Sequence, residues 1–580
     1  MEKPVFPFSV KGHGRLERGL DETPRSRLHH GRFGRMFRSL PPAEFSDEIL
    51  VKLSKAPDQQ TPERMISEEE RDPQNHQPEV TSETKIDEEE NFGLPAGYTY
   101  FGQFIDHDIT FDPLSSLVKR NDPDGLTNFR TPALDLDSLY GGGPDDQPYL
   151  YEEDGIKFVL SNRDLTGALL NDKKTLVPFA KDLPRFKGRA LIGDKRNDEN
   201  VIISQLHGLF LRFHNSVAEQ NKGLTFKEVQ RLVRWHYQWL VLFDYLPRIV
   251  GTQMIEKILP HLTDGSSIYD KQPQLHFYTY RNDPFMPVEF SVAAYRFGHS
   301  MVRPVYRLSA YDFTDPRPEQ INGLDGRKVL FDPDPELALN GFHEFAAENG
   351  IDWHLFFDTD DHPISMQHLS KGRVQPAYKI DTSLVNPLAF LPEHSKPRSK
   401  APLDDKPNTN NLAYRNLKRG VMLGLPSGQA VARLMGLEPI DDRLLLVGKA
   451  TAEGLAPDTT NKHSGIKLPS IIDIDERFAG KAPLWFYILA EAMNEWRKRA
   501  EKKKPDGQEK NDDEKNAEPT ILGPVGGRIV AEVLIGLILG DNDSFLSMAP
   551  NWQPIYGNTG AATVFDKFTM GHLIDLLPIH

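Results

Sequence analysis

One short segment holds four polar residues whose types and spacing could do chemistry. If residues 101–109 form a helix, Gln103, Asp106 and His107 share one face because they are three and four residues apart, and Asp108 turns to another side. A neutral histidine beside a carboxylate can move protons. A buried His–Asp pair is, however, more often a hydrogen-bonded part of a core. The spacing alone leaves both interpretations open.

A second polar segment directly precedes an apolar helix. Arg196 and Glu199 lie just before the run that begins at Val201, and as an isolated feature they indicate a capping segment with solvated charges. His207 and His214 follow on one face of that run. Their apolar neighbours indicate that both histidines pack in the core.

A third segment combines a histidine with small residues. Ala293, Ala294 and Gly298 would let a flat ligand or another helix approach closely, and His299 would project from that face. A lone helical histidine is a weak signal for metal binding. Asn416, taken by itself, indicates nothing.

Helices must position these residues, because apolar side chains recur at helical spacing and alternating strand patterns are scarce. We expect a mainly α fold: a single large helical domain over 93–580 with few short strands and a charged surface loop at 500–519. Residues 1–92 predict an extended, partly flexible N-terminal arm, since 57–92 is rich in Glu, Asp, Pro, Ser and Gln. Seven segments show the helical pattern: 201–221, 226–249, 288–302, 408–423, 427–436, 484–500 and 525–540.

Composition excludes several classes of protein. The chain has 580 residues, 38% hydrophobic content and a net charge of −15, which argues against nucleic acid and anionic membrane as partners. The absence of cysteine excludes thiolate metal ligands, disulfides and thiol nucleophiles. No signal peptide or membrane span is visible, so we expect a soluble protein that is cytoplasmic by default, with signal-independent export still open. We expect a monomer whose partners are small molecules.

Taken in order, four motifs resemble the animal (peroxidase-cyclooxygenase) family of haem peroxidases, with a bacterial branch as the expected source. The motifs are Phe-Gly-Gln-Phe-Ile-Asp-His-Asp, Gly-Asp-Lys-Arg-Asn-Asp-Glu-Asn, Tyr-Arg-Phe-Gly-His-Ser and Asn-Leu-Lys-Arg, and the resemblance covers roughly residues 95–550. It implies a helical domain around a buried haem b.

The first two motifs are similar to the distal side of the haem site. The resemblance implies that His107 is the distal catalytic histidine, Gln103 the distal glutamine and Arg196 the catalytic arginine. It also implies that Asp106 and Glu199 form ester links to haem methyl groups. Members of the family with a sulfonium link have methionine after this glutamate. This chain has asparagine there, so we expect the two-ester type.

The other two motifs are similar to the proximal side. By resemblance, His299 is the ligand of the haem iron, Arg296 lies near the haem, and Asn416 accepts the other imidazole N–H and fixes the ligand's tautomer. Arg419 would pair with a haem propionate.

A calcium loop is a further expectation. The segment 131–141 is similar to the family's Ca²⁺-binding loop, with ligands from Thr131, the Ala133 carbonyl, Asp135 and Asp137, completed by Asp108. Hydroxyl, carbonyl and carboxylate oxygens suit calcium. Without the resemblance, a turn with surface acids remains an alternative.

The resemblance implies an enzyme that reduces hydrogen peroxide and oxidises iodide, bromide, thiocyanate or phenolic donors through a ferryl state. One alternative is a fatty-acid dioxygenase of the cyclooxygenase branch, which needs a tyrosine three residues before the proximal histidine; this chain has Arg296 there, and Tyr295 is one residue away. Another is a catalytically inactive calcium-binding or adhesion protein on the same scaffold. A zinc or iron hydrolase using His107 and Asp108 would need a His-x-x-x-His pair, which the chain lacks.

Overall fold

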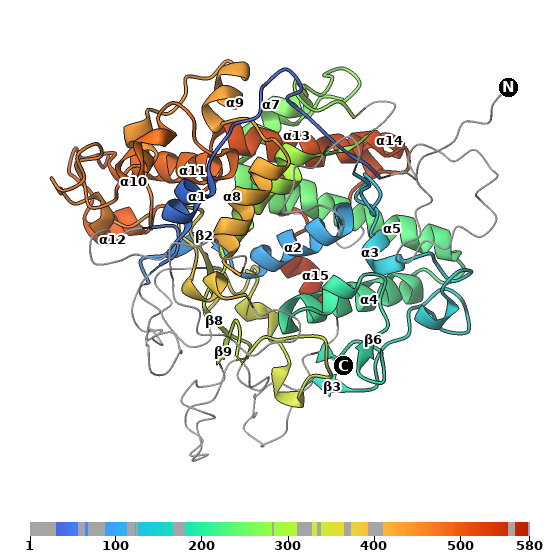
Figure 1. Cartoon of the computed structure of the whole chain (residues 1–580). Helices are drawn as coiled ribbons and strands as arrows, with labels where there is room; N and C mark the ends of the chain where they lie inside the picture. Colours follow the sequence, from blue (N-terminus) through green and yellow to red (C-terminus); the bar gives the residue numbers. More distant parts are fainter. Residues whose placement is uncertain are drawn as a thin grey trace, which may run out of the picture.

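Helices dominate the computed structural model of the chain (Figure 1), which confirms the predicted fold class. The structure describes residues 31–55, 64–67, 87–112, 122, 126–165, 180–280, 284–309, 327–332, 338–364, 373–391, 410–554 and 563–577. The α-helices among them are α1 (Asp47–Ser54), α2 (Gly97–Ile109), α3 (Asp137–Tyr140), α4 (Val201–Gln220), α5 (Phe226–Trp239), α6 (Leu246–Val250), α7 (Thr252–Ile258), α8 (Leu412–Met422), α9 (Gly428–Leu434), α10 (Ile471–Ile474), α11 (Leu484–Ala500), α12 (Asp512–Asn516), α13 (Pro524–Gly540), α14 (Phe545–Met548) and α15 (Met570–Leu576).

The strands of the described residues are short and form five two-stranded sheets. One pair is parallel, β1 (Phe33–Gly34) with β7 (Met286–Pro287). The antiparallel pairs are β2 (Glu90–Pro95) with β10 (Pro376–Tyr378), β3 (Asp164–Leu165) with β4 (Ala180–Lys181), β5 (Arg185–Phe186) with β6 (Arg189–Ala190), and β8 (Val305–Arg307) with β9 (Arg327–Val329).

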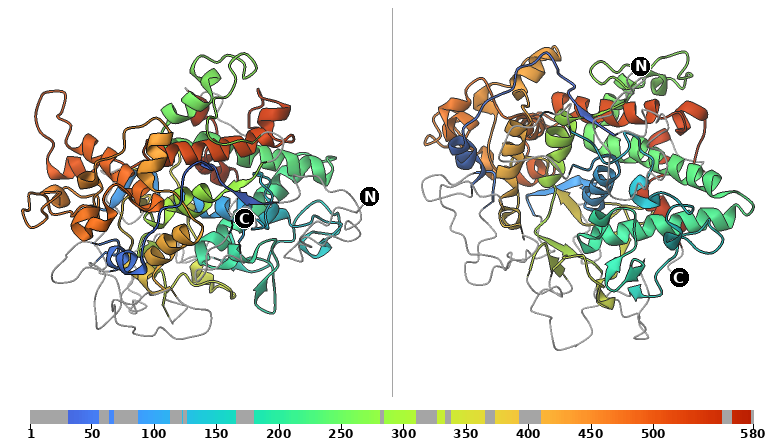
Figure 2. Two further views of the ribbon diagram at one scale, coloured as in Figure 1. Left: turned by 45° about the horizontal axis from the view of Figure 1, so that its top comes forward. Right: turned by 45° about the vertical axis from the view of Figure 1, so that its right-hand side comes forward.

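Helix α2 runs through the middle of the molecule, and all three views show other helices around it (Figures 1 and 2). It packs on α4 through Phe101 and Phe104, whose rings stack on Phe210 with centroids 6.2 and 4.9 Å away. The ring of Tyr237 on α5 meets Phe210 edge-on at 6.0 Å. Such aromatic pairs contribute about 0.5–1.5 kcal/mol each beyond their buried area. This packing sets which face of α2 points toward α4 and which toward the rest of the interior.

Two segments with helical periodicity are not continuous α-helices. Residues 288–302 form a π-helical turn, η7 (Glu289–Ala293), followed by a 3-10 helix, η8 (Ala294–His299), with a break at Ala293 (φ −124°, ψ −72°). Residues 226–249 are divided into α5, a π-helical stretch η5 (Leu240–Tyr245), and α6. Pro247 near the start of α6 has no N–H to continue the α-helical ladder, which explains that interruption.

The N-terminal residues that the structure describes differ from an extended arm. Residues 31–55 form β1 and α1, and Phe33, Leu50 and Leu53 are buried in the main core. Met65 and Ile66 are fully buried as well. Their apolar side chains are too few and too irregular in spacing to show a periodic pattern, although burial still makes them part of the core. Most of 57–92 lies outside the described residues. The charged segment 500–519 contains the short helix α12.

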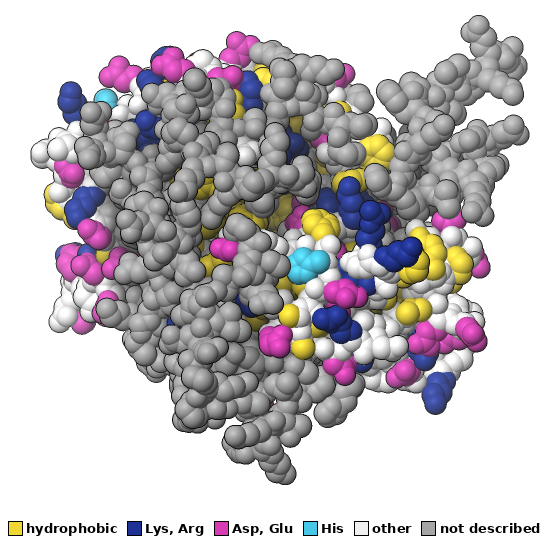
Figure 3. Space-filling model, turned by 60° about the horizontal axis from the view of Figure 1, so that its bottom comes forward, with side chains coloured by type: hydrophobic (Ala, Val, Ile, Leu, Met, Phe, Trp, Pro, Cys, Tyr) yellow, Lys and Arg dark blue, Asp and Glu magenta, His cyan; other side chains and the backbone are white. Residues whose placement is uncertain are grey.

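Charges of both signs share the surface. On the face in Figure 3, the described Lys and Arg side chains are interspersed with Asp and Glu. Among the helices of the described residues, none is both long enough and apolar enough to span a bilayer.

Candidate functional site

The predicted distal residues lie together on α2. His107 is buried at 5% exposure, while Gln103 and Asp106 on the same side of the helix are half-buried. The hydroxyl of Thr110, one turn further on, donates a 2.8 Å hydrogen bond to Asp106 Oδ1. Asp108 points to another side and is fully buried. The helical spacing thus separates two groups of polar residues, as the sequence predicts.

Residues from the second motif meet His107 across the interior. Glu199 Oε1 lies 3.8 Å from His107 Nε2 and accepts a hydrogen bond from Gln103 Nε2. Burial, with a further effect of the Arg196 charge, lowers the pKa of His107 to about 4. The imidazole is therefore neutral at pH 7 and can accept a proton.

Arg196 is held against both the backbone of α2 and a carboxylate. Its Nη2 donates to the His107 carbonyl at 2.9 Å and lies 2.7 Å from Asp194 Oδ2. The guanidinium also lies 4.6 Å from the ring centroid of Phe111. Although burial favours the neutral acid, Arg196 and Arg130 hold the pKa of Asp194 well below its usual range. These contacts place a permanent positive charge beside the distal histidine.

The Glu199 side chain combines partial exposure with a raised pKa. Its side chain keeps 36% of its surface exposed, yet burial raises its pKa to about 7, against the lowering effect of Arg196. Glu199 is therefore only partly covered by the residues around it. Gln103, Asp106 and Arg196 are half-buried in the same way.

His299 ends the 3-10 helix η8 on the proximal side. It is half-buried, and burial together with the Arg296 charge lowers its pKa to about 3, so the ring is neutral and can act as a metal ligand. A Cβ added to Gly298 would meet nothing within 4 Å, whereas Ala293 and Ala294 are fully buried. Gly298 thus borders open space, and the two alanines serve packing. Such open space beside a histidine ligand fits a flat cofactor.

Asn416 on α8 contacts His299 as expected, but with its amide nitrogen. Asn416 Nδ2 lies 2.7 Å from His299 Nδ1 and donates to it. An imidazole that binds a metal through Nε2 carries its proton on Nδ1 and needs an acceptor there. For the predicted role the Asn416 amide must turn over, which exchanges Nδ2 and Oδ1 without moving the backbone.

Three arginines gather near His299. Burial lowers the pKa of Arg419 to about 10; the charges of Arg296 and Arg415 act in the same direction, and the charge of Asp112 opposes them. Arg415 and Arg296 both lower the pKa of His299. Mutual repulsion of this kind is relieved by an anionic ligand, and the two propionates of a haem are anions of suitable charge.

Asp106 lies within electrostatic reach of the residues on both sides. Burial is the main cause that lowers the pKa of His107 and of His299, and the Asp106 charge acts in the opposite direction on both. The charge of one carboxylate therefore acts on both His107 and His299, and α2 contacts η8 directly. Together with the partly exposed Glu199 and the open space beside Gly298, this arrangement fits a haem.

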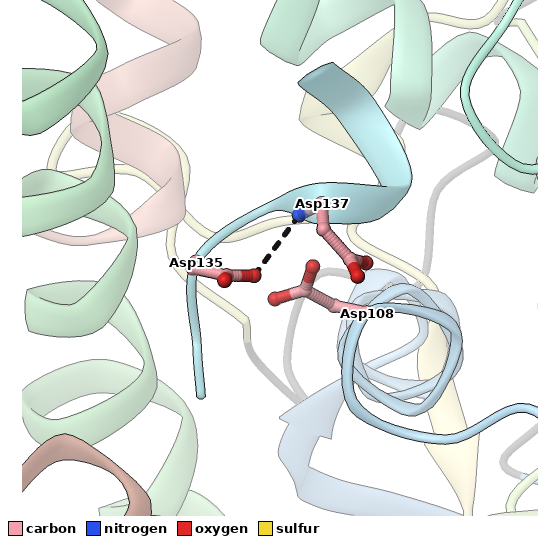
Figure 4. Close-up of side chains that lie close together, drawn as sticks. All are labelled: Asp108, Asp135 and Asp137. Carbon is pink, nitrogen blue, oxygen red and sulfur yellow. Dashed lines mark hydrogen bonds between the residues drawn. The ribbon is translucent and has the colours of Figure 1, made fainter. Parts of the chain in front are cut away.

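The acidic residues of the predicted calcium loop meet on the other side of α2 (Figure 4). Ligand oxygens of Asp108, Asp135 and Asp137 all lie within 4.8 Å of one another. Asp108 Oδ2 accepts from the backbone N–H of Leu136 at 3.1 Å, while its buried Oδ1 has no hydrogen-bond partner among the described residues. Leu136 has φ 59°, a left-handed conformation that turns the loop back toward Asp108. An unpaired buried carboxylate oxygen facing two carboxylates fits a divalent cation.

Thr131 and Ala133 lie at the start of this loop. The hydroxyl of Thr131 is 2.7 Å from Asp135 Oδ2, close enough to join the same ligand set. Ala133 lies between these two residues in the chain, and the role of its carbonyl stays a prediction. Arg130 lies beside the cluster, with Nη1 3.2 Å from Asp137 Oδ1, and it also forms an ion pair with Asp194.

Sequence reasoning missed Arg130, Asp194 and Asn197, and it interpreted His207 only as a histidine packed in the core. Asp194 and Arg130 connect the acidic cluster to Arg196. Asn197 and His207 form a hydrogen-bonded chain behind His107. The sequence offered a signal only for Asp194, a cap-type residue two positions before Arg196.

The sequence comparisons match this chain to peroxidases. The family model for animal haem peroxidases matches residues 116–348, a range that contains Arg196 and His299. Thyroid peroxidase of Homo sapiens is 27% identical over 250 residues, which cover 39% of this chain and 24% of that protein. Myeloperoxidase of Mus musculus is 30% identical over 138 residues, which cover 22% of this chain and 17% of that protein. The chain therefore matches about a quarter or less of the length of these relatives.

Among solved structures, peroxidase A from Dictyostelium discoideum has a similar fold. The TM-score is 0.51 with 16% identity, covering 96% of this chain and 94% of that chain. The fold defines a mainly helical protein with one histidine, His107 or His299, in each of two polar clusters. The chain is therefore similar in sequence to animal haem peroxidases over part of its length.

Proposed function

We propose that the chain is a haem peroxidase that reduces hydrogen peroxide and oxidises a small donor, such as iodide, bromide, thiocyanate or a phenol. The observation that carries this proposal is that His107 lies beside Arg196 and that His299 is hydrogen-bonded to Asn416, while the Asp106 charge acts on both histidines. Bound haem would supply the iron that activates peroxide and holds the oxidising equivalents.

His107 and Arg196 would divide the work on the distal side. The neutral His107 accepts a proton from hydrogen peroxide and returns it to the departing oxygen, so that water leaves. Arg196, fixed by Asp194 and the His107 carbonyl, stabilises the negative charge that grows on that oxygen. A positioned cation of this kind contributes about 2–4 kcal/mol to the transition state.

Asp106 and Glu199 are proposed to attach the haem through ester bonds. The raised pKa of Glu199 supports this, because a carboxyl near pKa 7 is partly protonated at neutral pH and is easily held against an apolar ring. Asn200, which replaces the sulfonium-forming methionine, has a local use instead: its Oδ1 accepts from the N–H groups of Ile202 and Ile203 and caps α4.

We also propose that Asp108, Asp135, Asp137, Thr131 and the Ala133 carbonyl bind Ca²⁺. Because Asp108 adjoins His107, the cation would hold the distal histidine in place. Chelation with EDTA should lower the melting temperature, and added CaCl₂ should restore it more fully than MgCl₂, since Ca²⁺ accepts a full set of protein oxygens whereas Mg²⁺ usually keeps several waters. A melting temperature that does not respond to either treatment would exclude the site.

The direct test of the peroxidase proposal is spectroscopic. Protein expressed with haem supply should show a Soret band that shifts on addition of hydrogen peroxide, and it should oxidise iodide or guaiacol. His299→Ala should lose stoichiometric haem, whereas the exposed His276→Ala should retain it. If the wild-type protein takes up no haem, a non-catalytic protein on the same scaffold is the better description.

The structure gives no support to the fatty-acid dioxygenase alternative. Tyr295 is 7% exposed, stacks on Phe290 at 4.6 Å and meets Tyr245 edge-on at 6.5 Å. Its ring is thus part of an aromatic cluster. Arg296 occupies the position at which that chemistry needs a tyrosine.

A further inference from the structure

Two buried residues continue the hydrogen bonding of the distal histidine away from the cofactor side. Asn197 Oδ1 lies 2.7 Å from His107 Nδ1, and Asn197 Nδ2 lies 2.9 Å from His207 Nδ1. The exposed fractions of His107, Asn197 and His207 are 5%, 0% and 0%. We call these three side chains the His–Asn–His bridge.

The bridge has one direction of hydrogen bonding. An amide oxygen only accepts, so His107 must carry its proton on Nδ1, which leaves the lone pair of Nε2 free toward Glu199. An amide nitrogen only donates, so His207 Nδ1 must be unprotonated and its proton sits on Nε2. Burial lowers the pKa of His207 to about 3, which agrees with a neutral ring.

Packing alone does not account for a histidine at position 207. The ring meets Phe104 edge-on at 6.2 Å, a contact that an apolar side chain would make equally well. His207 Nε2 is buried and has no hydrogen-bond partner among the described residues. A polar atom left unpaired in the core disfavours histidine there, so the bond from Nδ1 to Asn197 is the feature that requires it.

Both partners are fixed by secondary structure. Asn197 lies in the 3-10 helix η4 (Lys195–Asp198), where its N–H donates to the Asp194 carbonyl at 3.0 Å. His207 lies in the middle of α4, which packs on α2 through Phe104 and Phe210. The same short helix carries Arg196, so one element positions both the guanidinium and the amide relative to His107.

We propose that Asn197 and His207 are positioning residues that hold His107 in the Nδ1–H tautomer and aim its Nε2 at the peroxide. The effect on rate rests on the peroxidase function proposed above. The tautomer of His107 does not depend on that function, because it is a property of the protein without haem. A proton on Nε2 would make His107 unable to accept one from peroxide, so the bridge selects the reactive form of the ring.

The primary experiment measures the tautomer in the haem-free full chain. Imidazole ¹⁵N chemical shifts of ¹⁵N-histidine-labelled protein, with the His107 signals assigned by their loss in His107→Gln, should show an Nδ1–H ring. In Asn197→Leu, which has nearly the same shape but no hydrogen-bonding group, the ring should shift toward the Nε2–H form. An Nε2–H ring in the wild type, or an unchanged ring in Asn197→Leu, would overturn the proposal.

A kinetic experiment tests the consequence with a matched pair at position 207. His207→Asn places an amide oxygen near the position of the lost Nδ1 and can still accept from Asn197, whereas His207→Leu cannot. Per bound haem, the second-order rate of reaction with hydrogen peroxide should fall roughly 10–100-fold in Asn197→Leu. The rate should fall less in His207→Leu and recover most of that loss in His207→Asn.

The outcomes separate this proposal from the function on which it rests. If melting temperature and haem content fall in these variants while the rate per haem is unchanged, the residues are only structural and the bridge has no positioning role. If the wild type shows the Nδ1–H ring and Asn197→Leu loses it, but no haem binds, the bridge stands and the peroxidase function fails. If Asn197→Leu does not fold, the tautomer of His107 in the wild type and the rates of the two variants at position 207 still test the proposal.

Discussion

Arg130→Leu should be among the most destabilising single changes near the site, because the buried Arg130 joins the buried carboxylate of Asp194 to the half-buried carboxylate of Asp137. Arg130 and Asp194 are 6% and 4% exposed, and Asp137 lies 3.2 Å from Arg130 Nη1. Removing one partner of a buried pair typically costs about 3–5 kcal/mol. Arg196 still neutralises Asp194, so we expect a loss near the lower end, about 3 kcal/mol in unfolding free energy.

The assay is urea unfolding of the full chain followed by tryptophan fluorescence, in EDTA so that bound cation does not compensate for Asp137. Arg443→Leu is the matched control, because it breaks an ion pair with Asp441 in which the side chains are 63% and 45% exposed. Exposed pairs contribute roughly 0–1 kcal/mol. If Arg130→Leu lowers the free energy of unfolding no more than Arg443→Leu does, then burial does not strengthen the contribution of the Arg130 ion pairs to stability, and the prediction is wrong.

Three further predictions concern catalysis, haem attachment and pH. With haem content unchanged, His107→Ala should slow the reaction with hydrogen peroxide by roughly 10² or more in stopped-flow measurements, and an unchanged rate would remove His107 from the proposed role. Asp106→Val and Glu199→Gln should each let acid-acetone extract more haem than from the wild type; equal extraction would contradict the ester links. The hydrogen bond to Asp352, opposed by burial and aided by Asp575, raises the pKa of His354 to about 9. The stabilising effect of the protonated His354 is therefore complete below about pH 6.5 and is lost as the pH rises through 9. The melting temperatures of wild type and His354→Asn should differ at pH 6 and converge at pH 9.5. A difference that grows with pH would refute this assignment.

The proximal segment shows where periodicity alone is insufficient. Apolar spacing over 288–302 predicts a helix, and the structure contains helical turns there. These turns are of the π and 3-10 types, so the faces of an ideal α-helix do not apply to His299. The π-helical and 3-10 turns meet at Ala293, where the backbone departs from the i to i−4 hydrogen-bonding pattern of an α-helix. That departure depends on the helices packed around the segment.

Local spacing in the sequence determined the long helices and the separation of His107 from Asp108 on α2, because a helix repeats every 3.6 residues wherever it lies. Motif resemblance added the expected pairing of His299 with Asn416, which are 117 residues apart. Only the tertiary structure decided that Asn197 lies between two histidines and that Arg130 joins the acidic cluster to Asp194. Contacts of this kind depend on how α2, η4 and α4 pack, and buried polar groups find their partners only after that packing has excluded water.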